Sequence, residues 1–482
     1  MAITALIPRL KTPGVYIEEI PKLPPSIAQV ETAIPAFIGY TEKALDSRNE
    51  SLLDTPYRIS SLLEYEQYFG VANAEVGSIT VEIAENRGKF EVNGRINAET
   101  RSKFLMYYAL QLFFENGGGP CWIVSVGNYT ASGGVILQTD LRRGLDATEK
   151  IDEITLYVFP DAQGLDNAAD YYGLYQAAIA MCVNLQDRFT VMDVWQNPEL
   201  PPDQWFTNIE ELRNNTSVEI NELKYAAAYY PNLRTTLDFY YGGEGDGDAN
   251  VQIVHTGGDG RFNGTFAELK SKDNALYFRA KSAVRAIPCE MPPSPIMVGI
   301  YARVDAARGV WKAPANVSVR AVIEPVKKIT HREQENLNVD TTAGKSINVI
   351  RSFPGRGNIV WGARTLAGND NEWRYVPVRR FFNMVEESTK NATVQFVFEP
   401  NDKNTWTRVR SMIENFLTLQ WRAGALMGAT TEEAFYVRVG LGETMTELDI
   451  WEGRMIVEIG MAVVRPAEFI ILQFSHKMLS ES

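Results

Sequence analysis

Residues 154–161 read ITLYVFPD, a short apolar run that closes in turn-forming residues and predicts a buried β-strand. A helical pattern follows over about 168–186, where apolar side chains recur three and four positions apart, and FTVMDVW at 189–195 predicts a second strand. A strand, a helix and a strand in this order predict a βαβ unit with parallel strands and a right-handed connection. The centre of the chain therefore predicts an α/β domain.

The alternation of helices and strands continues on both sides of this unit. Downstream, the pattern predicts helices over about 203–215 and 295–308 and a short strand at 225–231. Upstream, an amphipathic helix ends at the glycine run 117–119, and CWIVSV at 121–126 predicts another strand. We expect one α/β domain with a largely parallel sheet.

The C-terminal third has a different pattern. Residues 376–392 are expected to start extended and become helical, and VQFVFEP at 394–400 has the composition of a strand. Asn404 or Thr405 is positioned to cap a long helix that ends near Gly428. Helices and strands that do not strictly alternate indicate an α+β domain.

Three further strands are predicted near the C-terminus, at 433–440, 454–464 and 467–475, with the last two forming a hairpin across Arg465–Pro466. The run AEFIILQFSHK at 467–477 leaves only five residues after it, and TPGVYIEEI at 12–20 is a similar apolar segment fenced by prolines. Unpaired apolar strands invite association. Two interpretations follow: either both segments pair within their own chain, or they are lent to neighbouring copies.

Composition indicates a large folded protein. A chain of 482 residues with 45% hydrophobic and 11% aromatic residues is expected to build two or three domains. Cys121, Cys182 and Cys289 lie far apart in apolar contexts and are expected to be buried thiols in a reducing compartment. The chain has no apolar run of 18 residues and no signal peptide, so we expect synthesis in a cytoplasm and no direct membrane insertion.

The net charge of −13 argues against nucleic acid as a main partner. The acidic excess lies in residues 1–350, because residues 351–482 hold 15 basic and 16 acidic residues. Residues 374–422 contain eight basic and five acidic residues. This window is either an ordinary mixed-charge surface or a basic face that meets an acidic partner.

Motifs for catalysis are incomplete. Residues 342–346 are similar to the end of a phosphate-binding loop, but Val339 stands where the first glycine is required. The acidic run 242–250 lacks the glycine and glutamate of a Ca²⁺-binding loop and predicts a flexible acidic loop. His331 does not begin a zinc-binding HExxH motif, and no metal site or cofactor is predicted.

Two aspartates remain as catalytic candidates. Asp161 and Asp193 follow predicted parallel strands, at the edge where open α/β sheets usually bind ligands. Paired carboxylates there would hold Mg²⁺ or serve as acid and base in a metal-dependent hydrolase. The alternative is that both carboxylates cap helices or turns.

Several segments resemble the contractile tail sheath proteins, in the same order as in that family. They are TPGVYIEEI (12–20), AIPAFIGYTEKA (33–44), ENGGGPCWIVSVG (115–127), PPSPIMVGIYARVDAARGVWKAPAN (292–316), GRGNIVWGARTLA (355–367), WRYVPVRRFFNMVEESTKNATVQFVFEPNDKNTWTRV (373–409) and the two final strands. The resemblance fades at three stretches that are expected to be variable loops or insertions: 71–100, 140–153 and 241–275.

The resemblance implies a structural protein and not an enzyme. Sheath proteins of this family form hexameric rings stacked helically around an inner tube, and they contract to drive the tube through a target envelope. The expected partners are other copies of this chain, the inner tube protein, and baseplate and terminal cap proteins. Assembly is expected in a bacterial cytoplasm, and the sequence leaves open whether the particle is a phage tail or an injection system.

The resemblance also implies domains and roles. The expected domains are an N-terminal arm at 1–30, an outer α/β domain at 31–340, a C-terminal α+β domain facing the tube at 341–466, and a C-terminal strand at 467–482. Strand exchange between copies is assigned to Val15, Tyr16, Ile17, Glu18, Phe469, Ile470, Ile471, Leu472, Gln473 and Phe474. Contact with the inner tube is assigned to Arg379, Arg380, Lys403, Arg408, Arg410 and Arg422.

Overall fold

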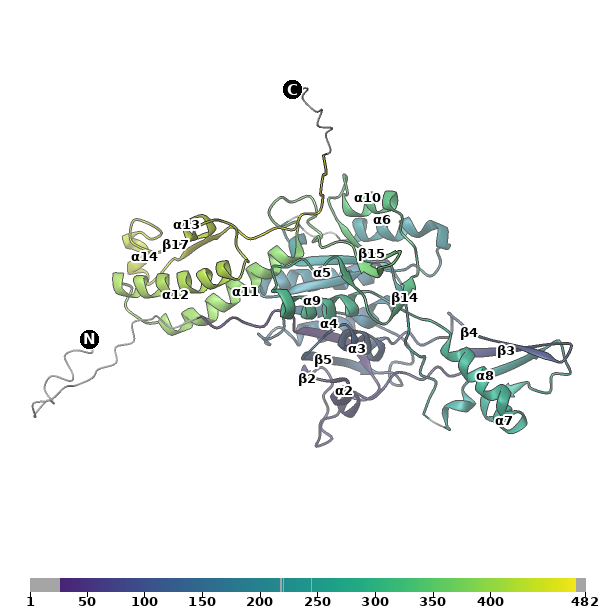
Figure 1. The fold of residues 1–482 in the computed structure, drawn as a ribbon. Coiled ribbons are helices and arrows are strands. Elements are labelled where there is room, and N and C mark those ends of the chain that lie inside the picture. The colour runs from purple at the N-terminus through teal and green to yellow at the C-terminus, as the bar shows by residue number, and fades with distance from the viewer. Residues whose placement is uncertain (1–26, 217–218, 220, 244, 474–482) are drawn as a thin grey trace, which may run out of the picture. The chain divides into compact units, whose positions relative to one another are not determined.

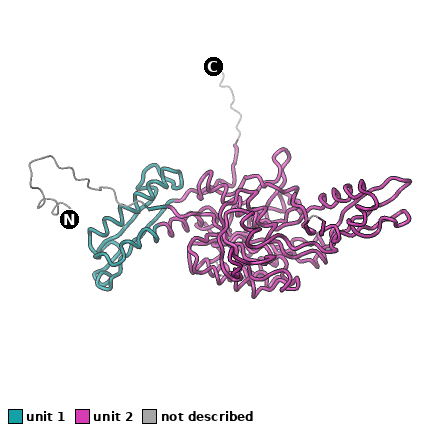
Figure 2. The backbone as a smooth tube through the Cα atoms, turned by 90° about the horizontal axis from the view of Figure 1, so that it is seen from below, with its two compact units in different colours: residues 1–28, 389–462 teal, residues 29–388, 463–482 magenta. Residues whose placement is uncertain are grey.

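The structure is a computed structural model, and it describes residues 27–216, 219, 221–243 and 245–473. The chain forms two compact units, coloured separately in Figure 2: a smaller unit of residues 1–28 and 389–462, and a larger unit of residues 29–388 and 463–482. The predicted domain boundary at residue 341 differs from this division. Residues 347–349 pair with the central sheet of the larger unit, which explains why the segment up to residue 388 belongs there.

A nine-stranded sheet forms the centre of the larger unit. Its six middle strands, from β15 to β5, are parallel, and the strands at both edges are antiparallel to their neighbours. The strand order is β13 (Val317–Ser318), β16 (Gly357–Val360), β15 (Ile347–Phe353), β8 (Ala226–Tyr230), β7 (Phe189–Asp193), β6 (Leu156–Val158), β1 (Pro35–Thr41), β5 (Cys121–Asn128), β2 (Tyr57–Ile59).

Helices cover both faces of this sheet. In β1 the side chain of Phe37 joins one hydrophobic cluster, whereas those of Ala36 and Ile38 join the other, since neighbouring side chains in a strand point to opposite faces. The first cluster contains α3 (Met106–Glu115) and α9 (Ser294–Arg308). The second cluster contains α4 (Gln138–Asp146), α5 (Ala168–Leu185) and α6 (Trp205–Asn215). Central strands buried on both faces explain the nearly continuous apolar runs in the sequence.

Helices α3 and α9 pack closely against each other. A Cβ atom added at Gly299 of α9 would lie 2.6 Å from the backbone oxygen of Phe113 in α3. Glycine is therefore needed at this crossing, because a larger residue would push the two helices apart.

Two of the stretches expected as variable loops form one ordered sheet. Val81 pairs with Ile253, which brings the insertion near 71–100 beside the insertion near 241–275. The strand order is β11 (Gly264–Thr265), β10 (Gln252–Thr256), β3 (Ile79–Asn86), β4 (Lys89–Ile96), and the sheet is covered by α7 (Phe266–Lys272) and α8 (Asn274–Arg285) (Figure 1). The third stretch, near 140–153, begins within α4 and continues as turns from residue 147.

The remaining elements of the larger unit connect these sheets. They are the three-stranded antiparallel sheet β12 (Cys289–Met291), β9 (Leu233–Thr235), β14 (Val322–Pro325); helices α2 (Leu62–Phe69) and α10 (His331–Asn338); and the short 3₁₀ helices η2 (Pro160–Gly164), η3 (Pro202–Gln204), η4 (Leu223–Tyr225) and η5 (Gly247–Ala249). Helix α11 (Val376–Thr393) continues across the boundary into the smaller unit.

The smaller unit is built around α12 (Lys403–Arg422), whose first turn is capped by Asp402 accepting from the Thr405 N–H at 3.0 Å. Its other elements are η6 (Val394–Phe396), α13 (Thr431–Ala434), β17 (Phe435–Arg438), α14 (Glu447–Trp451) and β18 (Glu458–Met461). Strands β17 and β18 are antiparallel, and in the described part of the chain they form a sheet by themselves.

The predicted βαβ unit is confirmed: β6 and β7 are parallel and α5 lies between them in sequence. The predicted helices at 203–215 and 295–308 and the strands at 121–126 and 225–231 are also present, with small shifts at their ends. Mixed α/β structure with several sheets is therefore confirmed.

Four predictions for the C-terminal third are wrong. Residues 376–392 are helical from the start, and α12 is capped by Asp402, not by Asn404 or Thr405. Residues 394–400 begin with a 3₁₀ helix because they only bridge α11 and α12, and Val394, Val397 and Phe398 are exposed. The predicted hairpin across Arg465–Pro466 is absent from the described residues up to 473, where β18 pairs with β17 instead.

Candidate assembly surfaces

The carboxylate of Asp161 binds the start of a helix. Asp161 is fully buried, and its Oδ1 accepts hydrogen bonds from the N–H groups of Leu105 at 2.6 Å and Met106 at 3.1 Å, at the N-terminus of α3. Its Oδ2 accepts from the N–H of Tyr40 at 2.6 Å. Helix N-termini leave N–H groups without partners and carry partial positive charge, so a carboxylate is well matched there.

The carboxylate of Asp193 does the same for a second helix. It lies at the end of β7, and it accepts from the N–H of Ser294 at 2.7 Å and from the Ser294 hydroxyl at 2.5 Å, where α9 begins. Burial raises the pKa of Asp161 and of Asp193 to about 7, although their hydrogen bonds act in the opposite direction. Both aspartates are therefore helix-capping residues, the second of the two roles considered for them.

The loop similar to a phosphate-binding loop is filled by its own chain. The N–H groups of Thr342 and Ala343 each donate to the Asp340 carboxylate at 3.1 Å. Lys345 is buried, and its ammonium group donates to the backbone oxygen of Thr216 at 2.7 Å. Desolvation lowers the pKa of Lys345. The groups that would bind phosphate thus hold the loop together.

The other candidate ligands also have structural partners. In the acidic run 242–250, Asp248 is buried and accepts from the Tyr277 hydroxyl at 3.0 Å. His255 is buried beside Glu85, with 3.2 Å between His255 Nε2 and a carboxylate oxygen. Within the described ranges, no group of three or more His, Cys, Asp or Glu side chains is arranged to hold a metal ion.

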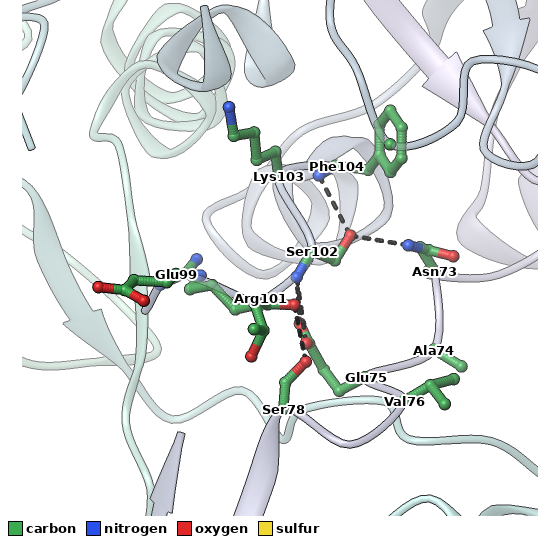
Figure 3. A pocket seen from close by; sticks show the side chains of 12 residues that line it. Asn73, Ala74, Glu75, Val76, Ser78, Glu99, Arg101, Ser102, Lys103 and Phe104 are labelled. Carbon is green, nitrogen blue, oxygen red and sulfur yellow. Dashed lines mark hydrogen bonds between the residues drawn. The ribbon is translucent and has the colours of Figure 1, made fainter. Parts of the chain in front are cut away.

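A cavity of about 410 Å³ lies where the inserted four-stranded sheet joins the rest of the larger unit (Figure 3). Its polar groups bond to one another: the Glu75 carboxylate accepts from the Ser102 N–H at 3.1 Å, and Asn73 donates to the Ser102 hydroxyl oxygen at 3.1 Å. These bonds link the two chain segments that enter and leave β3 and β4. These contacts make the cavity a structural joint between the inserted sheet and the rest of the larger unit.

Two of the predicted tube-contact residues are buried. The side chains of Arg379 and Arg380 are 2% and 3% exposed. Arg379 pairs with Glu386 of the same helix at 2.7 Å and stacks over Trp373, and Arg380 pairs with Asp305 of α9 at 2.6 Å. Neither guanidinium is available to a partner in this structure, which argues against their predicted role.

The other four predicted tube-contact residues lie on one side of α12. The opposite side buries Val409, Met412, Ile413 and Phe416, so the helix is amphipathic. Lys403, Arg408 and Arg422 are exposed and Arg410 is partly exposed, with Arg408 and Arg410 paired to Glu399 and Glu443 at the surface.

The environment of the C-terminal segment changes abruptly after Glu468, from a residue bound by an ion pair to residues exposed to solvent. Glu468 is bound by the guanidinium of Arg364, which is buried, whereas the next four side chains, Phe469 to Leu472, are 72–82% exposed. Four consecutive exposed apolar side chains mark an interaction surface. Gln473 is also exposed, and the predicted residues Phe474 and Val15 to Glu18 lie outside the described residues.

Comparison with known proteins identifies relatives over almost the whole chain. The sheath complex of an extracellular contractile injection system, PVC, in its contracted state is 31% identical, with a TM-score of 0.63, over 97% of this chain and 98% of that one. The contracted helical sheath of the anti-feeding prophage is also 31% identical, with a TM-score of 0.62, over 97% of this chain and 100% of that one. The chain belongs to the contractile tail sheath protein family.

Further matches agree with this assignment. The phage tail sheath C-terminal domain matches residues 368–477. The tail sheath protein of Vibrio phage KVP40 is 26% identical over 122 residues, which is 25% of this chain and only 18% of that longer protein. The relatives of this sheath protein are thus structural proteins and not enzymes.

None of the helices in the described ranges combines the length and apolar character needed to cross a bilayer.

Three functional candidates were not found from the sequence of this sheath protein. Arg364, Tyr375 and Asp305 hold the segments that lead to the two ends of the chain, as shown below, and no motif marks them. The one available signal was Arg364 itself, a charged residue within the stretch Ala363–Ala367, which is otherwise uncharged, since a buried arginine needs a partner.

We predict that Asp193→Asn changes the pH dependence of stability. Above its ordinary pKa of about 4 the carboxyl ionises in the unfolded chain but not in the folded one, so the free energy of unfolding falls as pH rises to about 7. In asparagine the Oδ1 still accepts from the Ser294 N–H and the amide NH₂ donates to the Ser294 hydroxyl oxygen, so both contacts persist without a group that titrates. The difference in unfolding free energy between wild type and variant should change by up to about 4 kcal/mol over this window, measured by urea denaturation at a series of pH values.

Asp161→Asn is the contrasting variant. Three N–H donors converge on the two Asp161 oxygens, so an amide NH₂ group would face a donor and destabilise the protein at every pH.

Parallel pH profiles for wild type and Asp193→Asn would show that Asp193 does not titrate as proposed.

Proposed function

We propose that this sheath protein polymerises as hexameric rings stacked helically around an inner tube and contracts to drive the tube through a target envelope. The observation that carries the proposal is its similarity, over 97% of the chain, to the subunits of two contracted sheaths. The proposal extends to baseplate and terminal cap proteins as further partners, because a similar chain of the anti-feeding prophage was solved in a baseplate. Assembly would take place in a bacterial cytoplasm, and the finished sheath would belong to a phage tail or an injection particle.

Strand exchange is the proposed link between copies. Phe469 to Leu472 expose apolar, strand-forming side chains, and an extended segment of this kind gains hydrogen bonds and burial by joining a sheet edge. The β17–β18 sheet has only two strands in the described residues, and a two-stranded sheet is marginally stable by itself. We assign the segment Phe469–Phe474 of one copy to the edge of this sheet in a neighbouring copy.

The N-terminal segment has the same proposed role. Val15, Tyr16, Ile17 and Glu18 would supply a second strand to a neighbouring copy; this assignment is based on their sequence and on the family resemblance. Two separate links for each subunit would keep copies joined while the units move during contraction.

The smaller unit is the proposed contact with the inner tube. Lys403, Arg408, Arg410 and Arg422 share the exposed side of α12, and they present positive charge on a protein whose net charge is −13. An acidic tube surface is the complementary partner. Under this proposal the larger α/β unit faces outward, and contraction draws its energy from rearranged subunit interfaces and not from nucleotide hydrolysis.

Electron microscopy of the purified chain, alone and with candidate tube protein, tests the function directly. We expect striated hollow cylinders, and a narrower form that depends on the tube protein. Folded but small, uniform particles in both samples would contradict the sheath proposal.

Deletion of residues 467–482, or of residues 1–22, should leave a folded protein that does not polymerise. Each deletion removes one proposed link and spares the hydrophobic clusters of the two units. Circular dichroism would check folding, and sedimentation with electron microscopy would check assembly. Removal of residues 478–482 alone, which spares the apolar segment, is the control and should assemble. Sheaths of normal length from either larger deletion would rule out strand exchange.

Charge reversal on α12 should separate the sheath from its tube. Arg408→Glu with Arg422→Glu is expected to weaken tube binding by on the order of 2 kcal/mol for each subunit, about 30-fold, and raised salt should weaken the wild-type contact. Co-sedimentation with tube protein at low and high salt measures both effects. Lys89→Glu with Lys270→Glu, exposed in the larger unit, is the matched control. If neither the charge reversal nor raised salt changes the affinity for the tube protein, the contact is not electrostatic.

A further inference from the structure

The segment that leads to the N-terminus is clamped by buried charges. The Arg380 guanidinium of α11 donates to the Asp305 carboxylate at 2.6 and 3.1 Å and to the backbone oxygen of Thr32 at 2.8 Å. The Thr32 hydroxyl donates to the same carboxylate at 2.6 Å. Arg380 and Asp305 are both buried, so these charge-assisted bonds lie in a protected site.

A second bond fixes the same segment further along α11. The N–H of Val30 donates to the Ser388 hydroxyl oxygen at 3.1 Å, and that hydroxyl donates to the backbone oxygen of Met384 at 2.6 Å. Arg380 and Ser388 are eight residues apart in α11, about two helical turns, and so lie on a similar side of the helix. Residues 29–34, which we call the N-terminal root, are thus attached to α11 at two points.

The segment that leads to the C-terminus is clamped beside the start of the same helix. The Arg364 guanidinium donates to the Glu468 carboxylate at 2.9 and 2.5 Å, and the Tyr375 hydroxyl donates to it at 3.2 Å. Arg364 also donates to the backbone oxygen of Asn338 at 3.1 Å, which fixes the guanidinium. Tyr375 directly precedes α11. Residues 463–468, the C-terminal root, therefore end at a partly buried ion pair, one residue before the exposed apolar run.

We propose that α11, together with the Arg364–Tyr375 bridge at its N-terminus, is the common anchor region of both segments that link copies of this sheath protein, and that the Arg380–Asp305–Thr32 and Arg364–Glu468–Tyr375 clamps fix where each segment leaves the subunit. This inference rests on the proposed strand exchange. A tension applied through the N-terminal link would reach α11 and α9, and one applied through the C-terminal link would reach Arg364 and Tyr375 beside the start of α11. Arg364, Tyr375, Asp305 and Arg380 are positioning residues in this scheme, because they act on the exchanged strands only through the roots.

The length of each root shows why the clamps matter. An extended chain spans about 3.3 Å per residue, so release of six residues would lengthen a link by about 20 Å. A helical lattice requires one defined spacing between neighbours, and a link that varies by this amount would no longer define it. Bidentate arginine–carboxylate pairs are suited to the role because they are both strong and directional.

Hydrogen exchange of the unassembled chain tests the anchors without any sheath. Glu468→Gln weakens the C-terminal clamp, and we expect amide exchange at Thr365 and Val376, whose N–H groups are hydrogen-bonded beside Arg364 and Tyr375, to rise about tenfold or more, with residues 29–34 unchanged. Tyr375→Phe, which removes one bond and no charge, should give a smaller rise. Glu443→Gln removes the same charge from an exposed pair with Arg410 and should leave both roots unchanged.

Two adjacent arginines supply the matched test at the N-terminal root. Arg380→Lys keeps the charge but loses the fork that reaches both Thr32 and Asp305, so exchange of residues 29–34 should rise. Arg379→Lys changes an equally buried arginine whose bonds go to Asn383 and Glu386 of its own helix, and it should leave residues 29–34 protected. Equal exchange in all variants, with folding intact, would overturn the anchors.

Assembled particles test the mechanical part. Glu468→Gln and Arg380→Lys sheaths are expected to show irregular axial spacing and to break more often on contraction than wild-type sheaths, counted in electron micrographs. Raised exchange with wild-type spacing and integrity would show that the clamps hold the roots but do not set the lattice. If the wild-type chain forms no sheath, the proposed function fails and the mechanical part fails with it, while hydrogen exchange still decides whether the roots are anchored.

Discussion

Buried ionisable side chains that bind distant backbone groups organise the larger unit. Asp161 and Asp193 each hold the first turn of a helix from another part of the sequence, and Arg188, fully buried, donates to backbone oxygens of residues 148–151. An isolated buried charge is costly, and only a complete set of partners offsets the cost. Each such residue therefore selects one arrangement of strand and helix, and the packing of α3 and α9 on the sheet depends on it.

The same arrangement explains why an enzyme-like fold carries a structural function. The carboxyl edge of a parallel sheet is where α/β proteins usually bind ligands, and here the carboxylates at that edge are occupied by Leu105, Met106 and Ser294. Asp340 fills the phosphate-like loop in the same way. A fold does not determine a function, and in this sheath protein the polar groups of the edge stabilise the scaffold.

Local patterns predicted the structure well where local physics decides it. The βαβ unit at 154–195 followed from periodicity, because its strands are buried whatever lies beside them. The apolar composition of 394–400 and 467–473 was misleading, since a strand forms only where a partner edge is present. The guanidinium of Arg380 could not be placed from the sequence, because its burial depends on Asp305 and Thr32, far away in the chain. The function was predicted from the family resemblance, because the local sequence pattern alone was also compatible with a hydrolase.

The contrast between Glu468 and Phe469 bears on how such a chain would be kept ready to assemble. An apolar segment that is exposed but attached at a partly buried ion pair is held in a limited region of space, so joining a neighbour costs less conformational entropy than capturing a free tail. In a symmetric polymer the same contact recurs in every subunit, and a small change at one root is repeated along the whole assembly. Evolutionary selection for a defined spacing between subunits would therefore act on Arg364 and Arg380, although neither residue contacts the neighbouring copy in this scheme.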